Sequence, residues 1–207
     1  MKEVSKMQQY DFVIVGGSVA GIQAAIVAQR QHKMKSILVI REEEEVLVPC
    51  SIPYIYGTLG AVGRNLIPDA LLGNAELLVD KVISIDREAH TISTSSGETI
   101  SYKKLLLATG SVSVEPPISG LDLENVFFVR KRRQYLHSLR EAMDEAHRLV
   151  IIGGGFVGVE FADACIKRGL DVTLVELLPL CLQFVCPEDL CRRVENELQA
   201  RGVSVLT

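Results

Sequence analysis

The sequence predicts an α/β protein with two parallel-sheet units and a small antiparallel meander. Three observations predict this fold class. Short runs of branched apolar residues recur without alternation, which is typical of strands buried on both faces of a parallel sheet. Two of these runs are followed by glycines and then by a helix-like segment. A third stretch instead alternates apolar and polar residues, as a strand with one solvated face does.

The predicted parallel strands are 12–15, 36–40, 104–108, 148–152 and 171–176. Residues 18–33 and 156–170, rich in small and helix-forming residues, connect the first pair and the last pair of these strands. Each of these segments, together with the two strands that it connects, is therefore a predicted βαβ unit. We expect one domain at residues 1–112 and a second at 113–207, both incomplete, with the proline-containing stretch 112–125 as the connector.

Residues 76–104 alternate apolar and polar side chains, with turn signals at 86–87 and 95–97. This pattern predicts an antiparallel meander with one wet face. The charge runs at 42–45 and 130–133 are interpreted as solvated faces.

Composition excludes several classes of protein. The chain has 207 residues, 48% hydrophobic and 23% charged, with a net charge of −4, as in ordinary globular proteins. This balance favours neither nucleic acid nor an anionic membrane as partner. No apolar run approaches the roughly 20 residues that span a bilayer, and residues 1–12 lack the apolar core of a signal peptide. Five cysteines without a regular framework favour a reducing cytoplasm.

The first strand leads into a glycine turn made of Gly16, Gly17, Ser18, Val19, Ala20 and Gly21. In the dinucleotide fingerprint G-x-G-x-x-G, the first glycine allows the tight turn and the last allows close helix packing. The middle glycine lets a pyrophosphate approach the helix N-terminus. Ser18 stands at the middle position and is small enough to be tolerated. The ribose-binding acid is due about 20 residues later, where the strand ends in Arg41 followed by Glu42; Glu42 is the preferred candidate.

The second turn matches the fingerprint fully, with Gly153, Gly155, Phe156, Val157 and Gly158. Glu176 closes the next strand. A carboxylate there accepts from both ribose hydroxyls and repels a 2′-phosphate, which favours NADH over NADPH. Two Rossmann-like nucleotide-binding units are therefore predicted; the alternative is that both are tight turns with no ligand.

The order GGSVAG, a cysteine peptide, YKKLLLATGS, PPISGLDLENV and VIIGGGFVGVEFA resembles the flavoprotein pyridine nucleotide–disulfide oxidoreductases along nearly the whole chain. The resemblance implies FAD on the first turn and NADH on the second. It also implies cofactor contacts by the Ala108-Thr109-Gly110 element and by the backbone of Val82, which would meet the adenine. Glu160 matches a glutamate near the nicotinamide and flavin, and Arg130 is a looser match to a residue that approaches FAD.

Cys50 has no second cysteine nearby, whereas paired-cysteine reductases carry C-x-x-x-x-C at this place. The peptide resembles the single-cysteine branch of coenzyme A-disulfide reductases, NADH oxidases and peroxidases, and polysulfide reductases. Pro53 suits the first turn of a helix, so Cys50 is expected at a helix N-terminus, where the dipole favours a thiolate. The alternative is an inert core thiol.

The resemblance implies an NADH-dependent flavoprotein oxidoreductase in which Cys50 and Glu160 are catalytic and a disulfide, persulfide or polysulfide accepts the electrons. Val19 stands where related peroxidases and water-forming oxidases carry a histidine, which favours a sulfur acceptor. An NADH oxidase and a non-catalytic nucleotide-binding fragment are the alternatives. Because the family continues beyond the strand expected at the end of this chain, we expect the front part of a longer enzyme, homodimeric when full length.

Cys181, Cys186 and Cys191 recur every five residues, with no histidine nearby. Metal sites usually space their cysteine pairs more closely and add a second pair, so no metal is predicted, although a metal or a disulfide stays open as an alternative. A helix is expected to start at 187–189. Cys165 is interpreted as a packing residue.

Overall fold

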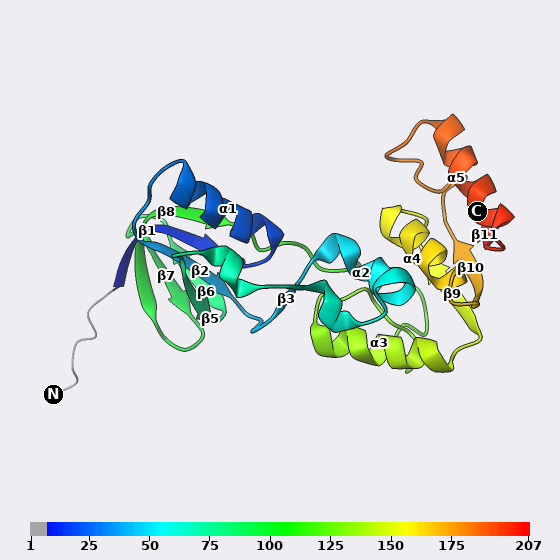
Figure 1. Cartoon of the computed structure of the whole chain (residues 1–207), viewed down its shortest axis with the longest axis horizontal. Coiled ribbons are helices and arrows are strands. Elements are labelled where there is room, and N and C mark those ends of the chain that lie inside the picture. Colours follow the sequence, from blue (N-terminus) through cyan, green and yellow to red (C-terminus); the bar gives the residue numbers. More distant parts are fainter. Residues whose placement is uncertain (1–7) are drawn as a thin grey trace. The chain divides into compact units, whose positions relative to one another are not determined.

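A computed structural model describes residues 8–207 of the chain. Residues 1–7, on which the expectation about a signal peptide partly rests, lie outside the described part. The chain forms two compact units (Figure 1). One unit runs up to Val48 and includes Leu66–Val114, and the other consists of Pro49–Asn65 and Glu115–Thr207. The segment 49–65 thus packs with the second unit, although it precedes much of the first in sequence.

The first unit contains a six-stranded sheet in the order β5-β2-β1-β8-β7-β6, a two-stranded pair β3–β4 and one long helix. Its elements are β1 (Gln8–Val15), α1 (Val19–Arg30), β2 (Ile37–Arg41), β3 (Val46–Leu47), β4 (Leu66–Ile67), a 3₁₀ turn (Asp69–Leu72), β5 (Glu76–Val79), β6 (Val82–Asp86), β7 (Thr91–Thr94) and β8 (Thr99–Leu107).

The meander is smaller than the sequence pattern predicted. Strands β6, β7 and β8 pair antiparallel as expected. Residues 76–79 were expected to belong with them, but β5 pairs parallel with β2 instead, Leu38 opposite Glu76. The physical reason is that Leu77 and Leu78 pack on the apolar clusters on opposite faces of the sheet, so this strand has no fully wet face.

The core of this unit lies on both faces of β1 and β2, as the continuous apolar runs predicted. Ile14 packs beneath α1 with Ile22 and Ala25. Its neighbour Val13 points to the other face, where it belongs to a second buried cluster that includes Leu38 of β2 and Ile100 of β8. Both β1 residues are fully buried. The helix and the meander therefore cover opposite faces of the strand that leads into the first glycine turn.

An ion pair between the buried Arg41 and the half-exposed Asp69 closes the C-terminal end of β2. Arg41 is only 5% exposed, and its guanidinium donates to both carboxylate oxygens of Asp69 at 2.7 and 2.9 Å. Its Nε also donates to the carbonyl of Glu43 at 2.8 Å, and a terminal nitrogen donates to that of Glu44. Arg41 thereby holds the acidic loop and the 3₁₀ turn together. Glu42, Glu44 and Glu45 are exposed in this loop, in keeping with a solvated charge run.

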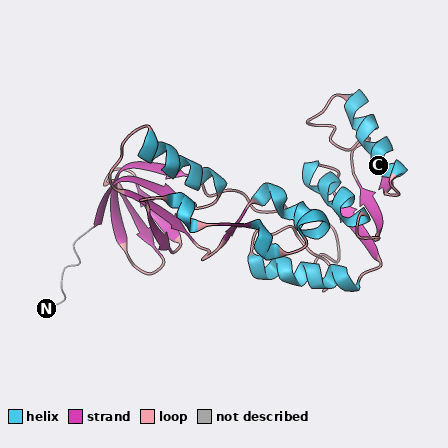
Figure 2. Ribbon diagram, in the orientation of Figure 1, coloured by secondary structure: helices cyan, strands magenta, loops and turns pink. Residues whose placement is uncertain are grey.

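The second unit contains a three-stranded parallel sheet in the order β11-β10-β9 with its helices (Figure 2). Its elements are a 3₁₀ turn (Pro49–Ser51), α2 (Ile52–Tyr54), a π-helical turn (Ile55–Leu59), a 3₁₀ turn (Val62–Asn65), α3 (Arg133–Glu145), β9 (Arg148–Ile152), α4 (Phe156–Ile166), β10 (Asp171–Val175), α5 (Glu188–Ala200) and β11 (Ser204–Leu206). The connector 112–125 contains neither helix nor strand.

One face of this sheet is not covered, which differs from the prediction that β9 is buried on both faces. Val150 and Ile152 are 62% and 59% exposed. The strand order β9, β10, β11 follows the chain, so two right-handed crossovers put α4 and α5 on the same face of the sheet. The opposite face therefore has no helical layer within the described residues. Among those residues, no helix combines the length and apolarity that crossing a membrane requires.

We expect Asp69→Asn to destabilise the first unit by about 1.5–3 kcal/mol, because it removes the charged acceptor of a buried guanidinium. Amide hydrogen exchange of β1 and β2 measures this cost for the unit alone. The matched control is Lys103→Gln, which breaks the pair between Lys103, 64% exposed, and Asp11 and should cost less than about 1 kcal/mol. Equal effects of the two substitutions would contradict a structural role for the Arg41–Asp69 pair.

Candidate functional site

The first glycine turn is packed too closely for side chains at its first and last positions. Gly16 has φ +114°, and a Cβ on it would lie 2.1 Å from the carbonyl oxygen of Ala108. A Cβ on Gly21 would lie 1.8 Å from the carbonyl oxygen of Gly16. The predicted glycine turn and the predicted Ala108-Thr109-Gly110 element therefore meet at the C-terminal ends of β1 and β8. Thr109 is exposed, and Gly110 has φ +75°.

Ser18, at the middle glycine position, has a partner that a glycine could not have. Its hydroxyl donates to the carbonyl of Leu47 in β3 at 3.3 Å. Helix α1 begins directly afterwards, with no side-chain cap and no acidic residue in its first turn, and Val19 and Ala20 are exposed. Backbone N–H groups at such a helix start suit an anionic group.

Arg41 and Glu42, the two candidates for binding the ribose near the first turn, differ in whether their side chains are already held by other residues. The Arg41 side chain lies against Gly17, where a Cβ would come within 2.8 Å of its Cδ, and its guanidinium is held by Asp69. Glu42 is exposed and lies 3.7 Å from the ammonium of Lys81. The amide of Asp80 donates to the carbonyl of Arg41 at 2.9 Å.

Val82 begins β6 directly after this contact, so the structure brings residues 80–82 beside Arg41 and Glu42. Of these two, Glu42 has the side chain that is open to a ligand.

The second glycine turn repeats this close packing but has open space at its middle glycine. Gly153 has φ +106°, and a Cβ on Gly158 would lie 1.9 Å from the carbonyl oxygen of Gly153. A Cβ on Gly155 would meet no atom of the described chain within 4 Å. Phe156 and Val157 are 57% and 50% exposed, and α4 has no side-chain cap. This turn fits the approach of a pyrophosphate to the helix start.

Glu176 is fixed at the rim of the second turn. One carboxylate oxygen accepts from the amide of Gly154 at 2.6 Å, and the other accepts from the amide of Leu178 at 2.9 Å. An ionised carboxylate has about four lone-pair sites, so it can still accept ribose hydroxyls. The predicted acid and the predicted turn are thus side by side.

Cys50 is exposed in the 3₁₀ turn Pro49–Ser51, and Pro53 lies in the first turn of α2, as predicted. As expected, a helical segment begins directly after Cys50: α2 spans Ile52–Tyr54 and passes without a break into the π-helical turn Ile55–Leu59. Cys50 lies in the 3₁₀ turn at the N-terminal end of this segment.

The peptide that carries Cys50 is anchored on α3 and α4. The buried Tyr56 donates its hydroxyl to the carbonyl of Leu136 at 3.1 Å, and its ring lies 5.3 Å from that of Phe161. Burial raises the pKa of Tyr56, so this hydroxyl stays a donor. A Cβ on Gly57 would lie 2.9 Å from Cα of Ala164. The thiol peptide is thus attached to the helix that begins at the second glycine turn and carries Glu160.

Arg130 belongs to the second unit and has partners there. Its guanidinium lies 5.8 Å from the ring centroid of Phe128 and 5.3 Å from that of Tyr135. It also lies 3.5 Å from the carboxylate of Glu115. Cation–π contacts of this kind keep the exposed side chain against its own connector.

All five cysteines lie among the described residues, all are free thiols, and Cys50 is the exposed one. Cys165 is fully buried in α4, as predicted for a packing residue, and burial raises its pKa to about 12. Burial and the neighbouring Glu195 carboxylate raise the pKa of Cys181 to about 12 as well. Within residues 8–207, no cluster of three or more histidine, cysteine or carboxylate side chains has metal-binding geometry. Cys181, Cys186 and Cys191 form no disulfide.

The fold and the two glycine turns define an α/β protein with two dinucleotide-binding turns, in the class of the nucleotide-dependent oxidoreductases. Residues 10–207 match the family described as pyridine nucleotide-disulphide oxidoreductase, and the chain belongs to this family.

An NADH oxidase of Enterococcus faecalis is 30% identical over 204 residues, which cover 93% of this chain and 46% of that protein. The ferredoxin reductase subunit of a 5,5'-dehydrodivanillate O-demethylase from Sphingobium is 31% identical and is covered to 50%, with 96% of this chain aligned.

Among solved structures, an NAD-dependent persulfide reductase from A. fulgidus superposes with a TM-score of 0.85 at 29% identity, covering 95% of this chain and 39% of that chain. A ferredoxin reductase from Rhodopseudomonas palustris gives a TM-score of 0.83 at 26% identity, covering 94% of this chain and 50% of that chain. The chain spans about half the length of the curated relatives it matches. FAD and NAD(H) are the cofactors of this family, as the resemblance implied.

Three features of the site were missed in the sequence: the Arg41–Asp69 pair, the contact of Ser18 with Leu47, and the thiol of Cys181 beside Gly154. Each feature joins residues far apart in the chain, and local sequence patterns do not predict contacts of this kind. The serine in place of a glycine was the one available signal, because a hydroxyl implies a partner.

Exposure and pKa predict an order of alkylation. We expect iodoacetamide at about pH 8 to modify Cys50 first, because thiols with a pKa near 12, such as Cys165 and Cys181, are only about 10⁻⁴ ionised there. Mapping the modified peptides by mass spectrometry checks the order, and Cys50→Ser should remove the fast phase. Labelling of Cys165 at the same rate as Cys50 would contradict the burial of Cys165 and the exposure of Cys50 described above.

Proposed function

We propose that this chain carries the two nucleotide-binding turns and the redox thiol of an NADH-dependent flavoprotein oxidoreductase. Electrons would leave through Cys50 to a small disulfide, persulfide or polysulfide. The observation that carries the proposal is that the exposed thiol lies on a peptide packed against α4, the helix that starts at the second glycine turn.

The second turn is proposed to bind NADH. Its helix start offers uncapped backbone amides to the pyrophosphate, and the open space at Gly155 admits it. Glu176, fixed by two backbone amides, accepts the ribose hydroxyls and disfavours a 2′-phosphate by charge repulsion. Glu160 is proposed to lie toward the nicotinamide, four residues along α4 from Phe156.

The first turn is proposed to bind FAD, which supplies the acceptance of a hydride and the onward transfer of its electrons. The residues of the chain hold it in place. The pyrophosphate would lie against the first glycine turn, which consists of Gly16, Gly17, Ser18, Val19, Ala20 and Gly21. The turn is bordered by Ala108, Thr109 and Gly110. The adenosine end would lie near Val82, Arg41 and Glu42. Arg130 is the loosest of these assignments, because its guanidinium already has aromatic and carboxylate partners.

Cys50 is proposed as the nucleophile toward the sulfur acceptor. A thiolate attacks a disulfide sulfur, and a mixed disulfide forms as one thiol leaves. Its exposure supplies the access that this reaction needs. A small-molecule acceptor and a homodimer in the full-length protein complete the proposal and rest on the resemblance. A reducing cytoplasm is proposed because the five cysteines form no regular framework.

A second candidate is an NADH oxidase, because relatives from Enterococcus faecalis and Methanocaldococcus jannaschii bear that name at 30% identity. The two candidates separate in one assay. Oxygen consumption with NADH supports the oxidase, and thiol release from coenzyme A disulfide under anaerobic conditions supports the disulfide reductase.

Gly155→Ala tests the nucleotide assignment without disturbing the fold. A Cβ there meets no atom within 4 Å, and φ is −74°, so the melting temperature should not change. The methyl group would occupy the space given to the pyrophosphate, and we expect NADH to bind about tenfold more weakly, about 1.4 kcal/mol, by fluorescence titration.

Gly158→Ala is the contrast, because its Cβ overlaps the carbonyl of Gly153 and should destabilise the unit itself. Undiminished NADH binding by the Gly155→Ala protein would refute this assignment.

Cys50→Ser tests the thiol step. In flavin-loaded protein, we expect loss of at least about 10²-fold in NADH-driven reduction of coenzyme A disulfide, because a serine hydroxyl cannot form the mixed disulfide. NADH should still bleach the flavin absorbance, since hydride transfer does not use this side chain. Disulfide turnover at the wild-type rate in the serine variant would exclude Cys50 as the nucleophile.

A further inference from the structure

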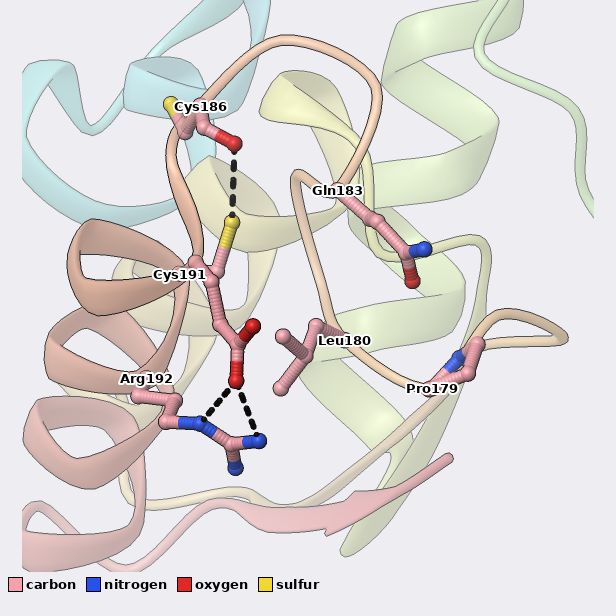
Figure 3. A pocket seen from close by; sticks show the side chains of 7 residues that line it. Pro179, Leu180, Gln183, Cys186, Cys191 and Arg192 are labelled. Carbon is pink, nitrogen blue, oxygen red and sulfur yellow. Dashed lines mark hydrogen bonds and ion pairs between the residues drawn. The ribbon is translucent and has the colours of Figure 1, made fainter.

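A cavity of about 330 Å³ lies between the loop 179–186 and the first turn of α5 (Figure 3). The loop follows β10. The wall of the cavity includes two of the five cysteines, Cys186 and Cys191. Gln183 and Arg192 add polar groups, and Arg192 is paired with Glu188 at 2.7 Å. This volume is within the range of small-molecule sites, so there is room for a small organic group beside the partly exposed Cys186.

The two thiols differ in access but are close to each other. Cys186 is half-buried, and Cys191 is fully buried. The Cys191 thiol donates to the carbonyl oxygen of Cys186 at 3.5 Å. Figure 3 shows the sulfur of Cys186 turned away from that of Cys191. A disulfide between the two would therefore require a different rotamer about the Cα–Cβ bond of Cys186.

The loop that carries Cys186 also supports the second glycine turn. The amide of Leu182 donates to the carbonyl of Gly154 at 2.9 Å, and the amide of Cys186 donates to the carbonyl of Leu182 at 3.0 Å. Leu182 has φ +61°, which is unfavourable for leucine and is maintained by these bonds. A Cβ on Gly154 would lie 2.6 Å from the sulfur of Cys181. A displacement of Cys186 therefore acts on Leu182 and through it on Gly154.

We propose that this cavity is a thiol-modification site, at which a small-molecule disulfide converts Cys186 and Cys191 into an intramolecular disulfide that loosens the second glycine turn. The Cys186 thiolate attacks the small disulfide, forms a mixed disulfide and releases one thiol. The Cys191 thiol then gives up its proton and attacks the Cys186 sulfur, which releases the second thiol. Two protein thiols are oxidised by two electrons, and the small disulfide is reduced to two thiols.

The consequence for the turn follows from geometry. The new bond pulls Cys186 toward α5, whose first turn holds Cys191 through the bond from its amide to the carbonyl of Pro187 at 3.0 Å. The bond from Cys186 to Leu182 lengthens, and the left-handed Leu182 relaxes away from Gly154. This site is separate from Cys50, and the cross-link forms whether or not Cys50 has a catalytic role.

The experiment treats the whole chain with oxidised glutathione as the probe and maps the thiols by alkylation and mass spectrometry. We expect the peptide containing Cys186 and Cys191 to lose two hydrogen atoms and to resist alkylation. Hydrogen exchange at the Leu182 amide should become at least about tenfold faster, because its bond to Gly154 is broken more often. NADH should bind about threefold to tenfold more weakly, and dithiothreitol should reverse every change.

Cys191→Ser and Cys186→Ser are the matched variants, and each should abolish the cross-link and the faster exchange. Cys50→Ser should retain both, which separates this inference from the thiol chemistry proposed above. A glutathione adduct on Cys186 without the cross-link, or a cross-link that involves Cys181, would overturn the proposed pair. A cross-link that leaves Leu182 exchange unchanged would overturn the coupling to the glycine turn, whatever the NADH titration shows.

Discussion

A backbone contact repeated in both units determines the rest of the structure. In each glycine turn, the carbonyl of the first glycine lies where a Cβ on the last glycine would be, 1.8 Å away for Gly16 and Gly21 and 1.9 Å for Gly153 and Gly158. This contact lets the helix start directly at the end of the strand, so that its uncapped amides face the C-terminal edge of the sheet. Other parts of the site are placed against these turns and helices. Arg41 and Glu176 lie against the glycine turns, the peptide that carries Cys50 packs on α4, and the loop 179–186 bonds to Gly154 through Leu182.

The two turns share one geometry but differ in charge. Arg41 is the last residue of β2 and Glu176 directly follows β10, and the side chain of each lies against the second residue of its glycine turn, Gly17 or Gly154. Glu176 is a carboxylate held by backbone amides, whereas Arg41 is a cation neutralised by Asp69. At the end of β2, the exposed carboxylate is therefore that of the neighbouring Glu42.

Much of the fold was predictable because its signals are local. Buried strands, glycine turns and the helix start at Pro187 follow from apolar runs and steric rules that act within a few residues. The predictions that were wrong concern strand pairing and burial, which depend on contacts between residues far apart in the sequence. Residues 76–79 pair with β2 because Leu77 and Leu78 find apolar contacts there, and β9 has an exposed face because both neighbouring helices pack on the other. The helical segment expected behind Cys50 is present, and its second part is a π-helical turn in which Tyr56 and Gly57 pack on α4.

The packing of the thiol peptide has a mechanical consequence. Gly57 leaves no room between its backbone and Ala164, and the Tyr56 ring lies on Phe161, so the peptide cannot slide along α4 without steric overlap. We therefore expect α4 and the peptide to move together, so that a tilt of α4 would displace the Cys50 sulfur without a rearrangement within the peptide.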